Sequence, residues 1–119
     1  MNVAVLGASN KPSRYSYMAV ERLLQNGHLV FPVHKVIKEV LSLKVYSNLS
    51  EIKEPIDTLT MYVNEDVSIS MEKAILQLNP RRIIFNPGTE NFDLADKARA
   101  VGIEVVFGCT LVMLSTGSF

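Results

Sequence analysis

Cysteine, histidine and tryptophan are scarce in this chain of 119 residues, which has one cysteine, two histidines and no tryptophan. The single cysteine cannot form an intramolecular disulfide, so the disulfide framework of small secreted domains is excluded. His28 and His34 do not provide the spacing of a metal-binding motif. The start of the chain does not resemble a signal peptide, and no apolar run approaches the ~18 residues that span a membrane. We therefore expect a cytoplasmic protein with no membrane partner.

A surplus of either charge is also missing, because Lys plus Arg and Asp plus Glu number 12 each. Nucleic-acid-binding domains usually carry a clear basic excess, so this balance argues against a nucleic-acid partner. Hydrophobic residues make up 48% of the chain, which is enough for a core. The length suits one domain over residues 1–119.

Short apolar runs alternate with patterns typical of helices. The runs predict strands at residues 3–6, 29–33, 57–63, 82–85 and 104–107. Apolar residues at helical spacing predict helices at residues 16–26, 71–78 and 94–101, with shorter ones near 38–43, 49–52 and after 109. Gly27 suits the end of the first helix, and Pro32 indicates an edge strand or a strand end. This order predicts an α/β, Rossmann-like, doubly wound and mostly parallel five-stranded sheet with helices on both faces.

Ligands of such sheets bind beyond the carboxyl ends of the strands. This rule selects the loops at residues 7–16, 34–36, 64–67 and 86–91. In the first of these, Gly7 suits either a close approach to a phosphate at a helix N-terminus or a tight turn. We expect the first role, with an ordinary φ at Gly7.

The loop "GASNKPS" lacks the second and third glycines of the G-x-G-x-x-G dinucleotide motif. Its hydroxyls, with Lys11 and Arg14, are suited to a pyrophosphate. Tyr15 can either cover an adenine or pantetheine group or pack onto the helix. After the second strand, His34 and Lys35 stand where an NAD-binding domain has an acidic residue. This basic pair suits the extra ribose phosphate of NADP or coenzyme A, unless both are ordinary surface residues.

Catalytic motifs are weak in this sequence. No G-x-S-x-G elbow, Cys–His pair or close acidic pair is present. We expect Cys109 to be a small core residue. Carboxylates on the candidate loops stand where they would complement helix dipoles, and we interpret them as capping residues: Glu65, Asp66, Glu90 and Asp93.

The run "VLGASNKPSRYSYMAVERLLQNGHLVFPV", with "VYSNLSEI", "NPGTEN" and "GCTLVML" further on, resembles the small CoA-binding domain proteins. These have a Rossmann-like fold related to the amino-terminal domain of the succinyl-CoA synthetase alpha subunit. Two departures stand out. His34 and Lys35 replace the usual Asn-Pro, and a glycine common near Ser42 is missing. The second domain and phosphorylated histidine of the synthetases are also missing.

The resemblance implies coenzyme A as the ligand. By this resemblance, the pyrophosphate would be bound by Gly7, Ala8, Ser9, Lys11, Arg14 and Ser16. Lys35, beside His34, would approach the 3′-phosphate, and Val63 and Asn64 would border the adenine. The pantetheine arm would pass along Asn86, Pro87 and Gly88.

The expected function is that of a stand-alone protein that binds coenzyme A or an acyl-CoA without catalysis of its own. One alternative is an NADP-dependent oxidoreductase-like domain. Another is a protein-interaction module that keeps the fold without the ligand and presents the apolar end "CTLVMLSTGSF" to a partner. A homodimer or a protein partner is compatible with each of these three functions.

Overall fold

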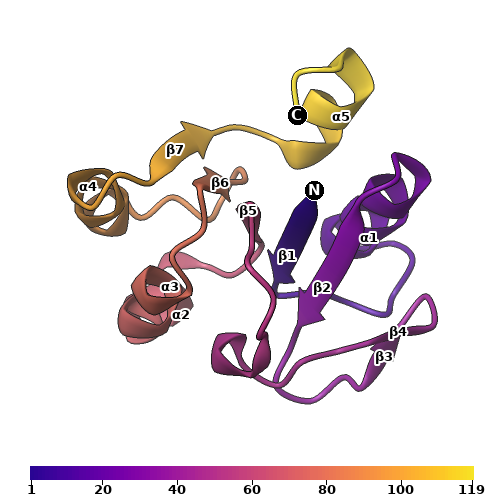
Figure 1. The fold of residues 1–119 in the computed structure, drawn as a ribbon. Helices are drawn as coiled ribbons and strands as arrows, with labels where there is room; N and C mark the ends of the chain where they lie inside the picture. The colour runs from indigo at the N-terminus through magenta and orange to yellow at the C-terminus, as the bar shows by residue number, and fades with distance from the viewer.

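The computed structural model describes residues 1–119 and contains a five-stranded parallel sheet (Figure 1). The strands are β1 (Asn2–Leu6), β2 (Leu29–Val33), β5 (Thr58–Met61), β6 (Arg82–Phe85) and β7 (Glu104–Phe107), in the order β2-β1-β5-β6-β7. Strands covered on both faces need continuous apolar runs, and the sequence supplies them in β1 and β6. The expected α/β fold class is confirmed.

Helices cover both faces of the sheet (Figure 1). One face carries α1 (Tyr15–Gln25) and α5 (Thr110–Thr116), and the other carries α2 (Glu65–Ser70), α3 (Glu72–Leu78) and α4 (Phe92–Ala100). Alternation along β1 sends Val3 and Val5 into the cluster under α1, and Ala4 and Leu6 into the cluster on the opposite face. None of these helices combines the length and apolar character needed to cross a bilayer.

A hairpin replaces the helix expected near residues 38–43. β3 (Glu39–Val40) and β4 (Leu43–Lys44) pair antiparallel around Leu41 and Ser42, whose φ angles are 49° and 65°. Two-residue hairpin turns with two positive φ angles usually contain Gly or Asn. The sequence did not predict this turn, because Leu41 and Ser42 are neither glycine nor asparagine. The short helix expected at residues 49–52 is confirmed as the 3-10 helix η1 (Leu49–Glu51).

β2 is an edge strand, as Pro32 indicates, and its outer side is covered. The Pro32 carbonyl accepts a hydrogen bond from the N–H of Tyr46 at 2.9 Å, and the N–H of His34 donates to the Tyr46 carbonyl at 3.0 Å. Gly27 follows the end of α1 with a φ of 81°, as expected of its position. Cys109 differs from expectation, because it is half-buried just before α5 and belongs to neither core cluster.

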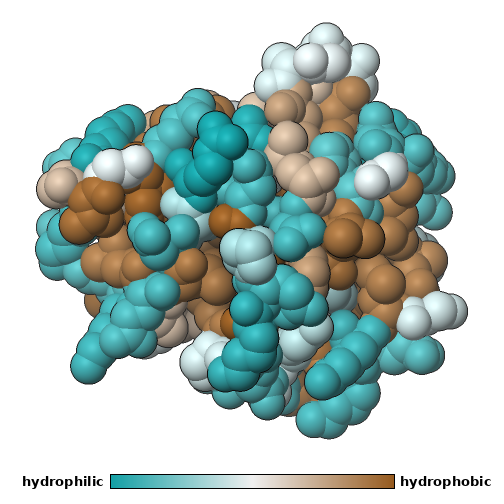
Figure 2. Space-filling view, viewed as in Figure 1, coloured by the Kyte–Doolittle hydropathy of each residue, from teal (hydrophilic) through white to brown (hydrophobic).

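The surface contains separate apolar areas. Figure 2 shows hydrophilic residues running down the middle of one face, with brown apolar areas on either side. The large apolar side chains with the greatest exposure include Phe92, Val101 and Val112, at 66%, 61% and 57%. Phe92 and Val101 belong to or follow α4, which lies beside β7, and Val112 belongs to α5, which packs against α1.

Three buried polar residues join the carboxyl ends of β5 and β6 to the start of α5. The Asn86 amide donates to the Thr60 hydroxyl (2.7 Å) and to the Met61 carbonyl (2.8 Å). Its Oδ1 accepts from the N–H of Thr110 at 2.8 Å. The Thr60 and Thr110 hydroxyls are also 2.8 Å apart. Because buried polar groups are costly when unpaired, this network holds three elements in one arrangement.

Gly7 makes the turn between β1 and the loop that follows it. Its φ is 90°, and a Cβ at this position would lie 2.7 Å from the Tyr62 carbonyl oxygen. The expectation of an ordinary φ at Gly7 is wrong. The sequence could not reveal this, because the close approach comes from the end of β5, far along the chain. The glycine is required by the fold itself, whatever the loop binds.

We expect Asn86→Asp to lower the free energy of unfolding by about 3 kcal/mol, because a carboxylate loses both amide donors inside a buried site. Chemical denaturation measures this loss. Asn64→Asp is the matched control, since Asn64 uses only Oδ1, which accepts from the N–H of Val67 at 3.0 Å. A carboxylate keeps that cap, so the control should stay near wild type. Equal losses in the two variants would contradict the role of Asn86.

We expect Gly7→Ala to destabilise the ligand-free protein by more than the ~1–2 kcal/mol of a positive φ alone, because the added methyl group meets the Tyr62 carbonyl. Thermal unfolding followed by circular dichroism measures the loss. Gly88→Ala is the control, because Gly88 has the same φ of 90° and a Cβ added there would meet nothing within 4 Å. The Gly88→Ala protein should lose only the ~1–2 kcal/mol of unfolding free energy that a positive φ costs. A smaller loss at Gly7 than at Gly88 would refute the steric argument.

Candidate functional site

The candidate site lies at the carboxyl ends of β2, β1 and β5. The chain passes from β1 to β2 on one side and later returns to place β5 on the other side of β1. Ligands of open α/β sheets bind where the strand order reverses in this way. Three of the four loops selected from the sequence contribute residues here, and the fourth, residues 86–91, does not.

A polar cleft of about 530 Å³ opens at this point. It is formed by the loop after β1, the start of α1, and the chain that follows β2 and β5. The lining residues are Gly7, Ala8, Ser9, Asn10, Lys11, Arg14, Ser16, His34, Ile37, Tyr62 and Val63. No carboxylate is among them, so a ligand with several phosphates would meet no like charge in the wall.

The amino end of α1 supplies unpaired N–H groups to this region. The first hydrogen bond of the helix runs from the N–H of Met18 to the Arg14 carbonyl at 3.1 Å, so the N–H groups of Tyr15, Ser16 and Tyr17 have no acceptor within the chain. Arg14 precedes the helix without capping it, and the first turn contains no acidic residue. Such an end attracts anions through its N–H groups and its dipole.

The amides of Gly7 and Ala8 have a different role. Both donate to the Val33 carbonyl, at 3.0 and 3.1 Å, and so tie the end of β1 to the end of β2. These two residues therefore line the cleft without offering free N–H groups. Within the cleft, the N–H groups without an acceptor belong to Ser9 and Asn10 of the loop and to the start of α1.

Two of the other helices, α2 and α4, have side-chain caps, whereas α3 and α5, like α1, have none. Asn64 caps α2, and Asn91 caps α4 by accepting from the N–H of Leu94 at 3.0 Å. The expected capping carboxylates lie in the first turns of these helices or just before them: Glu65, Asp66, Asp93 and Glu90. Among the helices without a side-chain cap, α1 is the one that begins beside the polar cleft.

The loop before α1 is folded by its own hydrogen bonds. Ser9 Oγ accepts from the N–H of Lys11 at 3.0 Å, and the Lys11 carbonyl accepts from the N–H of Arg14 at 3.0 Å. The side chains of Lys11 and Arg14 are exposed and take part in none of the four ion pairs of the structure. Two uncompensated positive charges therefore stand at the mouth of the cleft.

His34 organises the turn after β2. Its Nδ1 accepts hydrogen bonds from the N–H groups of Val36 (3.0 Å) and Ile37 (3.1 Å). An imidazole that accepts at Nδ1 carries its proton on Nε2, which is then available as a donor. His34 is therefore not simply the charged residue that the sequence indicates. It also takes over the acceptor role that an Asn side chain plays in similar turns.

A second, more apolar cleft of about 350 Å³ adjoins the first. The two share Gly7, His34 and Val63. The remaining lining residues are mostly aliphatic and come from β1, β2, α2 and the segment before η1: Leu6, Val33, Lys35, Val36, Ser47, Asn48, Val67 and Met71. An apolar recess beside a cationic cleft offers separate places for a base and for its phosphates.

Tyr62 lines the polar cleft, but its hydroxyl is buried below the cleft surface. Burial raises the pKa of Tyr62 to about 12, and its hydroxyl is buried without a hydrogen-bond partner. The group is therefore un-ionised at neutral pH and cannot act there as a base.

Five expected site residues lie outside both clefts. Tyr15 is 72% exposed, so its ring does not pack back onto α1. Asn64 is engaged as a helix cap, and Asn86 is engaged in the buried network. Pro87 and Gly88 are exposed in the turn after β6. The other expected residues line one cleft or the other.

Sequence reasoning missed several lining residues. Tyr62 directly precedes the expected Val63, so the position after the third main strand was the available signal. Asn10 lies inside the expected loop but was not selected. Ser47 and Asn48 reach the apolar cleft only because Tyr46 pairs with the end of β2. No pattern in the sequence indicates that contact.

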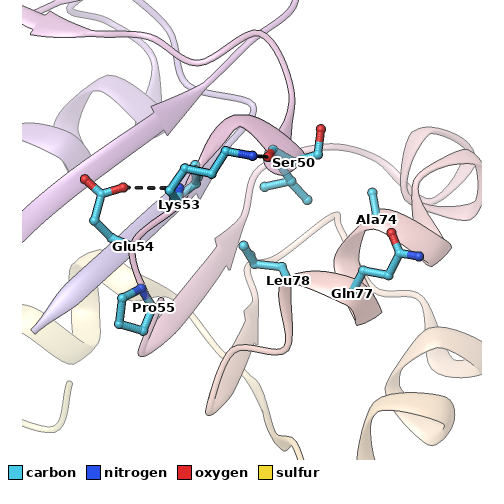
Figure 3. A pocket seen from close by; sticks show the side chains of 9 residues that line it. Ser50, Lys53, Glu54, Pro55, Ala74, Gln77 and Leu78 are labelled. Atoms are coloured by element: carbon cyan, nitrogen blue, oxygen red, sulfur yellow. Dashed lines mark hydrogen bonds between the residues drawn. The ribbon is translucent and has the colours of Figure 1, made fainter.

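Another hollow, of about 410 Å³, lies at the opposite ends of the strands, between η1 and α3 (Figure 3). Its polar groups bind one another. Lys53 Nζ donates to the Ser50 carbonyl at 3.0 Å, and the Glu54 carboxylate accepts from the N–H of Lys53 at 3.2 Å. The hollow is remote from the strand-order reversal, so we assign the candidate site to the two adjoining clefts.

Comparison with known proteins agrees with this fold. A crystal structure of an uncharacterized protein is 43% identical, with a TM-score of 0.90, over 99% of this chain and 97% of that one. A hypothetical protein from Pyrococcus horikoshii OT3 is 25% identical, with a TM-score of 0.89, over 96% and 81%. The dinucleotide-forming acetyl-coenzyme A synthetase 1 of Ca. Korarchaeum cryptofilum shares the fold at 22% identity, with a TM-score of 0.77, over 90% and 25%.

Among curated proteins, the uncharacterized protein YneT of Bacillus subtilis is 37% identical over 60 residues. The matched segment is 50% of this chain and 44% of YneT, so less than half of that relative is matched. The CoA binding domain family matches residues 1–115, which is nearly the whole chain. With the parallel sheet and the cleft at the amino end of α1, this match shows that the chain belongs to the CoA binding domain family.

Proposed function

We propose that this chain binds coenzyme A, free or acylated, across the two adjoining clefts, and that it carries out no reaction by itself. The observation that carries the proposal is the uncapped amino end of α1 beside a cleft with two unpaired cationic side chains. The family match supports the choice of coenzyme A among the anionic nucleotides.

In this proposal the pyrophosphate occupies the polar cleft. The free N–H groups of Ser16 and its neighbours bind phosphate oxygens, and the dipole of the 11-residue α1 adds a favourable field. Arg14 can bind two oxygens at once through its guanidinium, and Lys11 adds a second positive charge. The loop from Gly7 to Ser16 thus acts as a phosphate-binding loop.

The adenine fits the apolar cleft, between Val33 and Val36 on one side and Val63 and Met71 on the other. The ribose then lies near His34, at the junction of the clefts, and its 3′-phosphate faces Lys35. This assignment gives each chemical part of the nucleotide a wall of matching polarity.

The pantetheine arm leaves the pyrophosphate toward the carboxyl ends of β5 and β6. The Asn86 side chain has its amide and its Oδ1 occupied by Thr60, Met61 and Thr110, so it does not contact this arm. The exposed residues after it, Pro87 and Gly88, are the ones that border the path.

Two observations support the proposed absence of catalysis. His34 has its Nδ1 lone pair occupied by two backbone N–H groups. Tyr62 is un-ionised at neutral pH, because burial raises its pKa to about 12. Neither is free to accept a proton as a general base. In this proposal the chain holds the ligand, and any chemistry on the thiol or acyl group belongs to another protein.

We expect coenzyme A to bind more tightly than dephospho-CoA by a factor of roughly ten to one hundred, which corresponds to one charge-assisted contact to the 3′-phosphate. Isothermal titration calorimetry with coenzyme A, acetyl-CoA, dephospho-CoA, NAD and NADP measures this ranking. Equal affinities for coenzyme A and dephospho-CoA would remove Lys35 from the site. Tighter binding of NADP than of coenzyme A would favour the oxidoreductase-like alternative, and binding of none would favour the interaction module.

We expect Arg14→Ala to weaken coenzyme A binding by about 1.5–3 kcal/mol, because a charge-assisted hydrogen bond to the pyrophosphate is lost. The melting temperature of the ligand-free protein should hardly change, since the Arg14 side chain makes no internal hydrogen bond or ion pair. Arg22→Ala, at the far end of the same helix, is the control and should bind normally. A destabilised Arg14→Ala protein with unchanged affinity would assign Arg14 a structural role.

A further inference from the structure

β7 leaves one side of the sheet open. It is the last strand, next to β6, with α4 beside it before the chain turns into α5 (Figure 1). The N–H of Glu104 donates to the Arg81 carbonyl at 2.9 Å, and the N–H of Gly108 donates to the Phe85 carbonyl at 3.1 Å. Main-chain groups alternate in direction along a strand. The N–H and carbonyl groups of Val105 and Phe107 therefore point outward, away from β6.

The opposite side of the sheet is closed. In β2, Pro32 has no N–H to offer, and its carbonyl accepts from Tyr46, which lies against the outer side of the strand. Prolines, lysines and covering segments are the usual means by which proteins prevent edge strands from pairing. β7, with the sequence EVVF, contains neither proline nor lysine. The β2 edge of the sheet is thus protected against pairing with another strand by a proline and a covering segment, and the β7 edge has neither.

Aromatic and aliphatic side chains flank the open edge. The rings of Phe92 and Phe107 lie 5.3 Å apart, and Phe107 stacks on Phe85 at the same distance. Phe107 is 39% exposed and Phe92 is 66% exposed. A strand edge with unpaired main-chain groups and exposed aromatic rings is well suited to strand addition.

We propose that β7 pairs antiparallel with β7 of a second copy of this chain, with the two-fold axis passing beside Val106. In this register, Val105 of each copy lies opposite Phe107 of the other. The outward N–H and carbonyl groups of these residues form the hydrogen-bonded pairs, and Val106 faces Val106 as a non-hydrogen-bonded pair. The symmetry makes the contact closed, so it yields a dimer without leading to fibres.

The side chains also support this register. On the α4 face, each Val105 meets a Phe107, and pairs of aromatic and β-branched residues stabilise antiparallel strands. On the other face, Val106 meets Val106, and Glu104 meets Gly108, which brings no charge close. A shift that centres the axis on Glu104 would place two carboxylates opposite each other. The register centred on Val106 is therefore more favourable for two copies of this edge than the register centred on Glu104.

The dimer leaves the nucleotide clefts open. They lie at the ends of β2, β1 and β5, and β6 separates them from β7. The proposal therefore does not rest on the proposed function, and either can fail alone.

Sedimentation velocity over a concentration series tests the dimer. We expect wild type to shift toward dimer as its concentration rises. Val106→Lys and Val106→Glu should each raise the dissociation constant at least roughly tenfold, because like charges would face each other at the axis. An equimolar mixture of the two variants should recover the dimer. Val112→Lys, on an exposed position of α5, is the control and should behave as wild type.

Disulfide formation tests the register. A non-hydrogen-bonded antiparallel pair brings Cα atoms within the range that a disulfide needs. In a Cys109→Ser background, Val106→Cys should cross-link as a dimer on mild oxidation, and Val112→Cys should not. Circular dichroism confirms that each variant is folded. Wild type that stays monomeric at every concentration, or equal cross-linking by folded Val106→Cys and Val112→Cys proteins, would overturn the proposal.

Discussion

The carbonyl of Val33 receives two N–H groups, from Gly7 and Ala8, and the arrangement of the site depends on this contact. It joins the ends of β1 and β2 and sets the direction in which the chain leaves the sheet toward α1. The N–H of Tyr62 then donates to the Leu6 carbonyl at 2.8 Å, which brings the end of β5 to the same place. With its positive φ, Gly7 passes so close to the Tyr62 carbonyl that only a residue without a side chain fits. Three strand ends are thereby held together, and the uncapped end of α1 faces the space beside them.

Polar groups at the two halves of the sheet are used differently. At the ends of β5 and β6, Asn86 and its threonine partners satisfy one another in a buried network, which holds that half rigid. Near the ends of β1 and β2, the first N–H groups of α1 and the cationic side chains of Lys11 and Arg14 remain unpaired. A preformed set of unpaired donors lowers the ordering cost of binding an anion. The proposed function assigns the phosphate-rich ligand to the half with unpaired donors, while the other half serves the fold.

His34 shows how one side chain can serve both purposes. Its Nδ1 accepts two backbone N–H groups and shapes the turn after β2. The same ring lines both clefts, with Nε2 available as a donor. The turn at Leu41 and Ser42 is a similar case, because two residues with positive φ form the hairpin without the usual glycine. In both places a turn forms without the residue type that such turns favour.

The sequence by itself determined the strands, most of the helices and the carboxyl edge on which the site lies. Apolar runs of strand length and helical spacing report which residues must be buried, and burial is a local requirement. It also identified Lys11, Arg14 and the loop around them, because their position after β1 follows from chain order. Only the tertiary structure decided which donors stay free, since the amides of Gly7 and Ala8 are occupied by a carbonyl from β2. It also decided that Asn86 belongs to a buried network and that Ser47 and Asn48 reach the apolar cleft. These facts depend on contacts between residues distant in the chain, and no local pattern records which partners will meet.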